Sequence, residues 1–180
     1  MNTFSFSLLQ FFIILLSILI YPNWVIATQA CQPNIIKTGI DTRYQNNADG
    51  TITDLNNGLM WQQCNMGQSG ADCTLGADST YTWDAALQIV EQINTNDGFA
   101  SYTDWRLPNI KELFSLVEVA CSSPSINLTF FPNSGLAYWS STPANGTNGR
   151  SWILNFDEGN NSTTDRNLEH IVRLVRGGPQ

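Results

Sequence analysis

Basic side chains are scarce in this sequence, and histidine is almost absent. Eight Lys and Arg residues stand against fifteen Asp and Glu residues, and the formal net charge is −7 at pH 7. A protein of this charge has no general attraction to nucleic acid or to strongly anionic surfaces, so no nucleic-acid partner is expected. The one histidine, His170, has no obvious nucleophile in the sequence around it. No enzymatic activity and no catalytic residue are therefore predicted.

The sequence also lacks a C-x-x-C redox pair and a cysteine- and histidine-rich metal site. It has four cysteines, Cys31, Cys64, Cys73 and Cys121, which allow three disulfide pairings. The short spacing favours Cys64–Cys73, and this choice leaves Cys31 to join Cys121. We therefore predict a disulfide-stapled protein in an oxidising compartment, with no metal ligands.

One long apolar run extends from Leu8 to Ile20. Small residues follow at spacings that suit cleavage of a signal peptide, so residues 1–30 are predicted to be a signal peptide. Because no Lys or Arg precedes the run, an uncleaved N-terminal anchor stays open as the alternative. Such an anchor would be the only predicted contact with a membrane. Export to the periplasm, the cell surface or the medium follows, with an N-terminal arm at residues 31–43 and one domain at residues 44–177.

The first part of this domain has the pattern of strands joined by tight turns. Asp49-Gly50 and Asn57-Gly58 are turn pairs, and an apolar patch at residues 59–61 suits a buried strand. Residues 65–79 are rich in Gly, Ser and Asp, which is typical of a loop.

Helical spacing follows in two segments. Apolar residues between Trp83 and Ile93 recur every three or four positions, with Thr82 as the expected N-cap. A second helix is expected after Pro108, where Asn109 and Glu112 fit a capping box and the apolar spacing continues past Val117.

Strand patterns return at residues 137–142, 150–156 and 170–176, separated by polar loops. The order of elements predicts one α+β domain, with two mid-chain helices and antiparallel strands from both ends.

The tryptophans and Arg106 have both a structural and a functional interpretation. A Trp beside a guanidinium can hold a sugar or a sulfate, yet Trp residues in strands and before helices more often belong to the core. We assign Trp105 and Arg106 to the core, with Arg106 paired to Asp104 or Glu112. The other residues assigned to the core are Trp61, Trp83, Trp139 and Trp152. Tyr138 points the other way from Trp139 along its strand and is a candidate for the surface.

The late polar loops hold the best candidates for ligand contact. Their amides, carboxylates and guanidiniums suit sugar hydroxyls, or Ca²⁺ through oxygen ligands, although no cofactor is predicted. The predicted ligand-binding residues are Tyr138, Arg150, Asp157, Glu158, Asn161, Asp165 and Arg166.

Five motifs together resemble a known bacterial family. GLMWQQC, YTWDAAL, DWRLPNIKEL, YWSST and VRLVRGG occur here in the order and spacing found in the C-terminal domain of the Legionella collagen-like adhesin and its relatives. The resemblance runs from about Tyr44 to Gly177. It implies a C-type lectin-like fold, with two helices packed on a small, twisted antiparallel sheet, and a surface-associated role in binding sulfated glycosaminoglycans as a trimer.

The sequence departs from that adhesin in two respects. It has no Gly-X-Y tract to enforce trimerisation, and its acidity argues against sulfated glycans. We therefore expect an exported, adhesin-like binding module that recognises carbohydrate, with a glycan or extracellular-matrix ligand. The alternative is a structural protein of the envelope that binds another protein.

Overall fold

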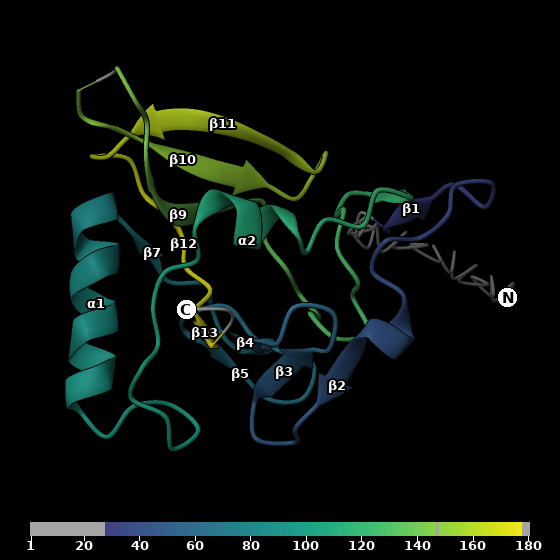
Figure 1. Ribbon diagram of the computed structural model, residues 1–180, viewed down its shortest axis with the longest axis horizontal. Coiled ribbons are helices and arrows are strands. Elements are labelled where there is room, and N and C mark those ends of the chain that lie inside the picture. Colours follow the sequence, from purple (N-terminus) through teal and green to yellow (C-terminus); the bar gives the residue numbers. More distant parts are fainter. Residues whose placement is uncertain (1–27, 147, 178–180) are drawn as a thin grey trace, which may run out of the picture.

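The computed structural model describes residues 28–146 and 148–177, and the protein in these ranges is built mostly of strands. Strands hold 34% of these residues and helices 14%. The strands form sheets of five, four, two and two strands (Figure 1). The predicted α+β arrangement of two helices on one small sheet is therefore wrong. The predicted signal peptide lies outside the described residues except for its last three positions.

The largest sheet has the strand order β11-β10-β9-β12-β7, and its strands come from the second half of the chain except β7. All neighbours are antiparallel except β9 and β12, which run parallel. The strands are β7 (Thr80–Tyr81), β9 (Ala137–Pro143), β10 (Arg150–Asn155), β11 (Asn160–Asp165) and β12 (His170–Ile171).

The second sheet has the order β13-β4-β3-β2 and is antiparallel throughout. It joins the two ends of the domain, because the last strand pairs with β4. Its strands are β2 (Tyr44–Asn46), β3 (Thr51–Asp54), β4 (Leu59–Gln62) and β13 (Val175–Gly177), and a short 3-10 helix, η1 (Asp41–Arg43), precedes β2. The turns at Asp49-Gly50 and Asn57-Gly58 join its strands, as predicted from the sequence.

The one long helix within the described residues is α1 (Trp83–Thr95). It begins where the sequence predicts, since the side chain of Thr82 accepts a hydrogen bond from the backbone N–H of Ala85. Among the described residues, no helix is long and apolar enough to cross a membrane.

The second helix, α2 (Ile110–Phe114), has only five residues, although its predicted start is correct. Asn109 and Glu112 form the full capping box. The helix ends early because the chain turns after Phe114 and Val117 enters a β-bridge with Ile126. A short helix is therefore enough to bring the apolar side chains after Phe114 into the core. Apolar residues spaced three and four positions apart do not require the helix to continue.

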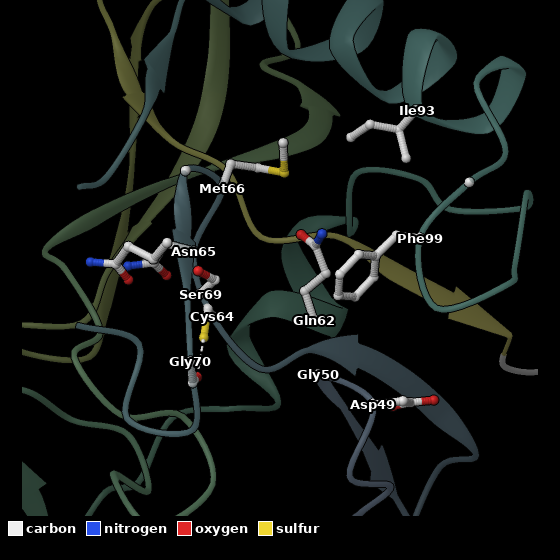
Figure 2. A pocket seen from close by; sticks show the side chains of 13 residues that line it. Asp49, Gly50, Gln62, Cys64, Asn65, Met66, Ser69, Gly70, Ile93 and Phe99 are labelled. Atoms are coloured by element: carbon white, nitrogen blue, oxygen red, sulfur yellow. Dashed lines mark hydrogen bonds between the residues drawn. The ribbon is translucent and has the colours of Figure 1, made fainter. Parts of the chain in front are cut away.

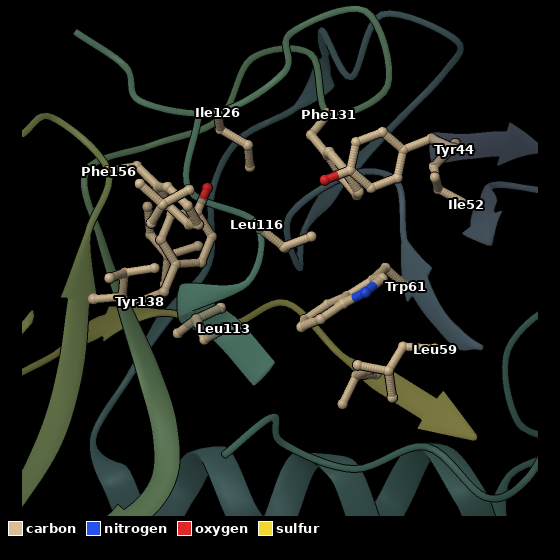
Figure 3. Close-up of a cluster of buried hydrophobic side chains, with 14 residues drawn as sticks. Tyr44, Ile52, Leu59, Trp61, Leu113, Leu116, Ile126, Phe131, Tyr138 and Phe156 are labelled. Carbon is tan, nitrogen blue, oxygen red and sulfur yellow. The ribbon is translucent and has the colours of Figure 1, made fainter. Parts of the chain in front are cut away.

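Two hydrophobic clusters hold the sheets and helices together. The first lies between the two large sheets and around α2, and it contains Trp61, Leu113, Tyr138 and Phe156 (Figure 3). The second lies between α1 and the five-stranded sheet, and it contains Trp105, Trp139 and residues of α1. Strand β9 therefore has a core on each face.

The N-terminal arm is tied to the domain by β1 (Ala30–Cys31), which pairs with β8 (Cys121–Ser122), and by a disulfide between Cys31 and Cys121. A second disulfide joins Cys64 and Cys73. These are the two pairs that the sequence spacing favours. Between the second pair lies the start of a small hairpin of β5 (Gln68–Ser69) and β6 (Leu75–Gly76).

Candidate functional site

A cavity of about 470 Å³ lies where four separate segments of the chain meet (Figure 2). Its volume falls within the range of about 300–1,000 Å³ that is usual for small-molecule sites. The segments are the β2–β3 turn, the end of β4 with the loop after it, the last turns of α1 and the loop that follows α1. The lining residues are Asp49, Gly50, Gln62, Cys64, Asn65, Met66, Gly67, Gln68, Ser69, Gly70, Ile93, Gly98 and Phe99.

The loop closed by the Cys64–Cys73 disulfide supplies more of this lining than any other segment, and a buried polar network fixes its first residue. Asn65 is 2% exposed, and its side-chain oxygen accepts hydrogen bonds from Arg173 Nη2 and from the hydroxyl of Tyr138, each at 2.7 Å. Its amide nitrogen donates to Asp78 Oδ1 at 2.8 Å. All the hydrogen-bonding capacity of the Asn65 side chain is thus directed away from the cavity.

Arg173 is fully buried behind this loop and lies over the rings of Phe131 and Tyr138. Burial lowers the pKa of its guanidinium, because the charged form loses solvation. The aromatic rings and the oxygen of Asn65 replace part of that solvation. Arg173 therefore acts as a structural support of the loop and does not present its charge to the cavity.

Phe99 forms the aromatic wall of the cavity and is held by the DWRLP segment. The indole of Trp105 packs edge-on against its ring, with 5.6 Å between centroids, and donates a hydrogen bond to its carbonyl oxygen at 2.9 Å. Asn94 of α1 in turn binds both backbone groups of Trp105. A Cβ at Gly50, where φ is +86°, would lie 3.1 Å from the ring, so glycine is needed there for both conformation and space.

One polar group without a protein partner among the described residues lies beside this apolar wall, the side-chain amide nitrogen of Gln62. The side-chain oxygen of Gln62 accepts a hydrogen bond from Leu174 N–H, which fixes the amide and leaves its nitrogen free of partners in the described part of the chain. Figure 2 shows this amide beside the ring of Phe99, on the side of Met66. The side-chain oxygen of Gln68 also has no partner among the described residues, but it is enclosed by protein and does not face the cavity. The Gln62 nitrogen is not enclosed by the protein, so a ligand or a water molecule can reach it and accept its hydrogen bond.

The described lining residues include no Lys, Arg or His, and Asp49 is their only acid. Within residues 28–146 and 148–177, no group of three His, Cys, Asp or Glu residues could hold a metal ion. The cavity therefore combines an apolar wall with neutral hydrogen-bonding groups and one exposed carboxylate.

Apart from Tyr138 in β9, the predicted ligand-binding residues lie near the two ends of the β10–β11 hairpin. Arg150 pairs with Asp165 at the start of β10, whereas Asp157 and Glu158 lie in the turn between β10 and β11. Five residue steps of about 3.4 Å separate these ends, so they lie about 17 Å apart along the strand. They do not form one compact site.

The two arginines of this set are already engaged within the protein. Arg150 donates to the hydroxyl of Thr163 at 3.3 Å and to its carbonyl oxygen. Arg166 donates to Ser151 Oγ at 2.8 Å and lies 4.0 Å from the centre of the Trp83 ring. That face of Trp83 is therefore covered and cannot stack on a sugar.

Glu158, Asn160 and Asn161 at the turn are exposed and Asp157 is half-buried, and some of these residues also have protein partners. Asp157 accepts a hydrogen bond from the hydroxyl of Ser123, and Glu158 accepts one from the amide of Asn160. Asn161 lies beside α2, where it lines a shallow pocket with Ile110, Lys111 and Phe114.

Tyr138 does not reach the surface, which corrects its prediction as a ligand-binding residue. Alternation along β9 does point Tyr138 and Trp139 to opposite faces, but each face is covered by one of the two clusters, and both side chains are fully buried. Trp61 and Trp105 are also buried, as expected of core residues, whereas Trp83 and Trp152 are only half-buried. Arg106 is partly exposed and forms a two-bonded ion pair with Glu112 at 2.7 Å.

The cavity is not apparent in the sequence, because the segments that line it are distant from one another and each has an ordinary composition. The Asp49-Gly50 turn and the Gly-rich loop predict only a hairpin and a connection. The one available signal was the short Cys64–Cys73 closure, which holds a polar loop rigidly at a surface.

A comparison with protein families finds that the model described as the Lcl C-terminal domain matches residues 50–176. A comparison with curated proteins finds no match. The family match covers every segment that lines the cavity apart from Asp49.

Proposed function

Because the chain belongs to the Lcl C-terminal domain family, we propose that it is a non-enzymatic carbohydrate-binding module of an exported bacterial protein, with the cavity around Phe99 as its binding site. The two disulfides are typical of proteins in an oxidising compartment, which agrees with export. The module would act at the cell surface, in the periplasm or in the medium, where glycans are available as ligands.

The observation that carries the proposal is the pairing of an aromatic wall with a fixed, unpartnered amide. A sugar ring has an apolar C–H face and a rim of hydroxyl groups, so it needs both kinds of surface at once. Phe99 is held by Trp105, and Gln62 is held by Leu174 N–H, so neither side chain has to be ordered when a ligand binds.

The chemistry of the lining supports a binding role in preference to catalysis. Cys64 is in a disulfide, and Ser69 has no histidine or lysine among the other described lining residues to activate it. His170 lies elsewhere, edge-on to Trp139, and its Nε2 atom is enclosed.

Binding of the full chain to a panel of immobilised and free glycans tests the proposal. Replacement of Phe99 by Leu keeps an apolar side chain but removes the aromatic face, and it should weaken binding about three- to tenfold. Phe114→Leu is the matched control, because Phe114 is 44% exposed on α2 and is not part of this cavity. Equal binding by both variants would exclude the cavity, and absence of binding to every glycan would exclude the carbohydrate module.

The alternative role, an envelope protein that binds another protein, is favoured by one surface feature. Ile35 and Ile36 in the N-terminal arm are 46% and 89% exposed, and Val119 in the adjoining segment is 53% exposed. Hydrogen bonds between Thr38 and residues 117 and 119 hold this arm beside that segment. Exposed apolar residues in one region are typical of protein contacts. Ile36→Asp should abolish such an association and leave glycan binding unchanged.

A further inference from the structure

We propose that the cavity selects neutral sugars and rejects sulfated or carboxylated glycans. This inference rests on the carbohydrate-binding role proposed above. The selectivity follows from the positions of charged residues relative to the cavity. It opposes the preference for sulfated glycosaminoglycans that the family resemblance implies.

The positive charges of the chain are largely used inside the protein. Three of the eight basic residues form ion pairs with carboxylates: Arg43 with Asp54, Arg106 with Glu112 and Arg176 with Asp104. Arg173 is fully buried. Arg150 donates a hydrogen bond to the carbonyl oxygen of Thr163, and the guanidinium of Arg166 lies over the ring of Trp83.

Only Lys37 and Lys111 remain without a hydrogen bond or ion pair to their side chains among the described residues, and they lie apart in the chain, on the arm and on α2. Neither lines the cavity. A sulfated glycan needs several cations along its length, because each sulfate loses hydration when it is bound. The described surface offers no such row near Phe99.

The groups that do line the cavity suit hydroxyls. The Gln62 amide nitrogen is a donor, the Ser69 hydroxyl can donate or accept, and the exposed Asp49 carboxylate is an acceptor. One oxygen of Asp49 accepts from Thr51 N–H and from its hydroxyl, which fixes the carboxylate and leaves its second oxygen for a ligand. This fixed negative charge attracts sugar hydroxyls as donors and repels sulfate and uronate groups.

The test measures binding of the full chain to glucose, galactose, mannose and N-acetylglucosamine disaccharides, and separately to heparin and chondroitin sulfate. Each titration is run between about 0.01 and 1 M NaCl, over which the Debye length falls from about 30 to 3 Å. We expect binding to at least one neutral sugar, with less than about a twofold change across this range, and no binding to the sulfated polymers. Gln62→Met should weaken the neutral interaction about tenfold.

Gln63→Met is the matched control, since Gln63 is the neighbouring buried glutamine but donates to Ala71 O and lies outside the cavity. Asp49→Asn, at an exposed turn, gives a second variant should Gln62→Met fail to fold. It should weaken neutral-sugar binding without creating an affinity for heparin.

The outcomes separate this inference from the proposed function. Salt-sensitive binding to heparin would overturn the selectivity while leaving a carbohydrate module. Neutral-sugar binding that Gln62→Met and Asp49→Asn leave unchanged would also overturn it, because the cavity would not be the site. Failure of both glycan classes to bind would overturn the proposed function itself.

Discussion

Among single residues, Arg43 and Asp54 form the most buried ion pair of the described chain, with side chains 9% and 0% exposed. Arg43 Nε donates to Asp54 Oδ1 at 2.9 Å, and Nη2 donates to the other carboxylate oxygen. The hydrogen bond and charge of Asp54 raise the pKa of Arg43 although burial acts against it. The pair joins η1 to β3, so it fixes the entry of the chain into the four-stranded sheet.

Loss of one partner of this pair should destabilise the protein more than loss of both. Asp54→Asn leaves a buried guanidinium without its counter-charge and should lower the free energy of unfolding by about 3 kcal/mol or more. The double variant Arg43→Met with Asp54→Leu buries apolar groups in place of charges and should lose less. Urea unfolding of the three proteins measures this difference, and a loss below about 1 kcal/mol for Asp54→Asn would contradict it.

At the scale of elements, the sequence predicts where structure begins better than where it ends. The caps at Thr82 and Asn109 are local hydrogen-bonding patterns, so they are visible in the sequence and present in the structure. The end of α2 depends on Val117 pairing with Ile126, a contact made across a turn with no signature in the helical spacing. The number of sheets likewise depends on which strands pair with one another. The periodicity of apolar residues along the sequence carries no information about that pairing.

The loop between Cys64 and Cys73 should contribute to stability and to binding at once, because it closes a short ring and lines the cavity. Replacing both cysteines by Ser should lower the free energy of unfolding by about 2–3 kcal/mol, through the greater freedom of the unfolded chain. It should also weaken glycan binding, since residues 65–70 line the cavity. Unfolding curves and glycan titrations on the same protein measure both effects.

The comparison variant replaces Cys31 and Cys121 by Ser. Their sequence separation is 90 residues instead of 9, so the expected loss of stability is larger, about 4–5 kcal/mol. Glycan binding should persist at temperatures where this variant stays folded, because neither cysteine lines the cavity. If instead it lost binding and the Cys64–Cys73 variant kept it, the site would lie at the arm.

For the whole molecule, the candidate site shows what a single sequence can and cannot reveal. The core tryptophans at 61, 105 and 139 were predictable from apolar patterns, since burial follows from the local sequence. The cavity was not predictable, because Gln62, Ile93 and Phe99 meet only after the two large sheets and α1 have packed together. The late-loop residues share a chemistry that suits ligand contact, but the geometry of the hairpin separates them.

The response of the whole protein to mild acid should depend on one residue, because the chain contains a single histidine. Burial lowers the pKa of His170 below its ordinary value of about 6.5, since the charged form loses solvation beside Trp139. A folded-state pKa below the unfolded one means that the unfolded chain takes up a proton first as the pH falls. The free energy of unfolding should therefore be highest above about pH 6.5 and decline below it, until the folded-state pKa is reached.

Replacement of His170 by Phe isolates this effect, because it keeps a ring against Trp139 and removes the titrating group. Urea unfolding of both proteins at intervals from about pH 7.5 to 5.5 should give a falling free energy for the native sequence and a nearly level one for His170→Phe. A single proton limits the slope to about 1.4 kcal/mol per pH unit. An equal decline in both proteins would assign the acid response to carboxylates, and a rise in stability toward pH 5.5 would mean that folding raises the pKa of His170.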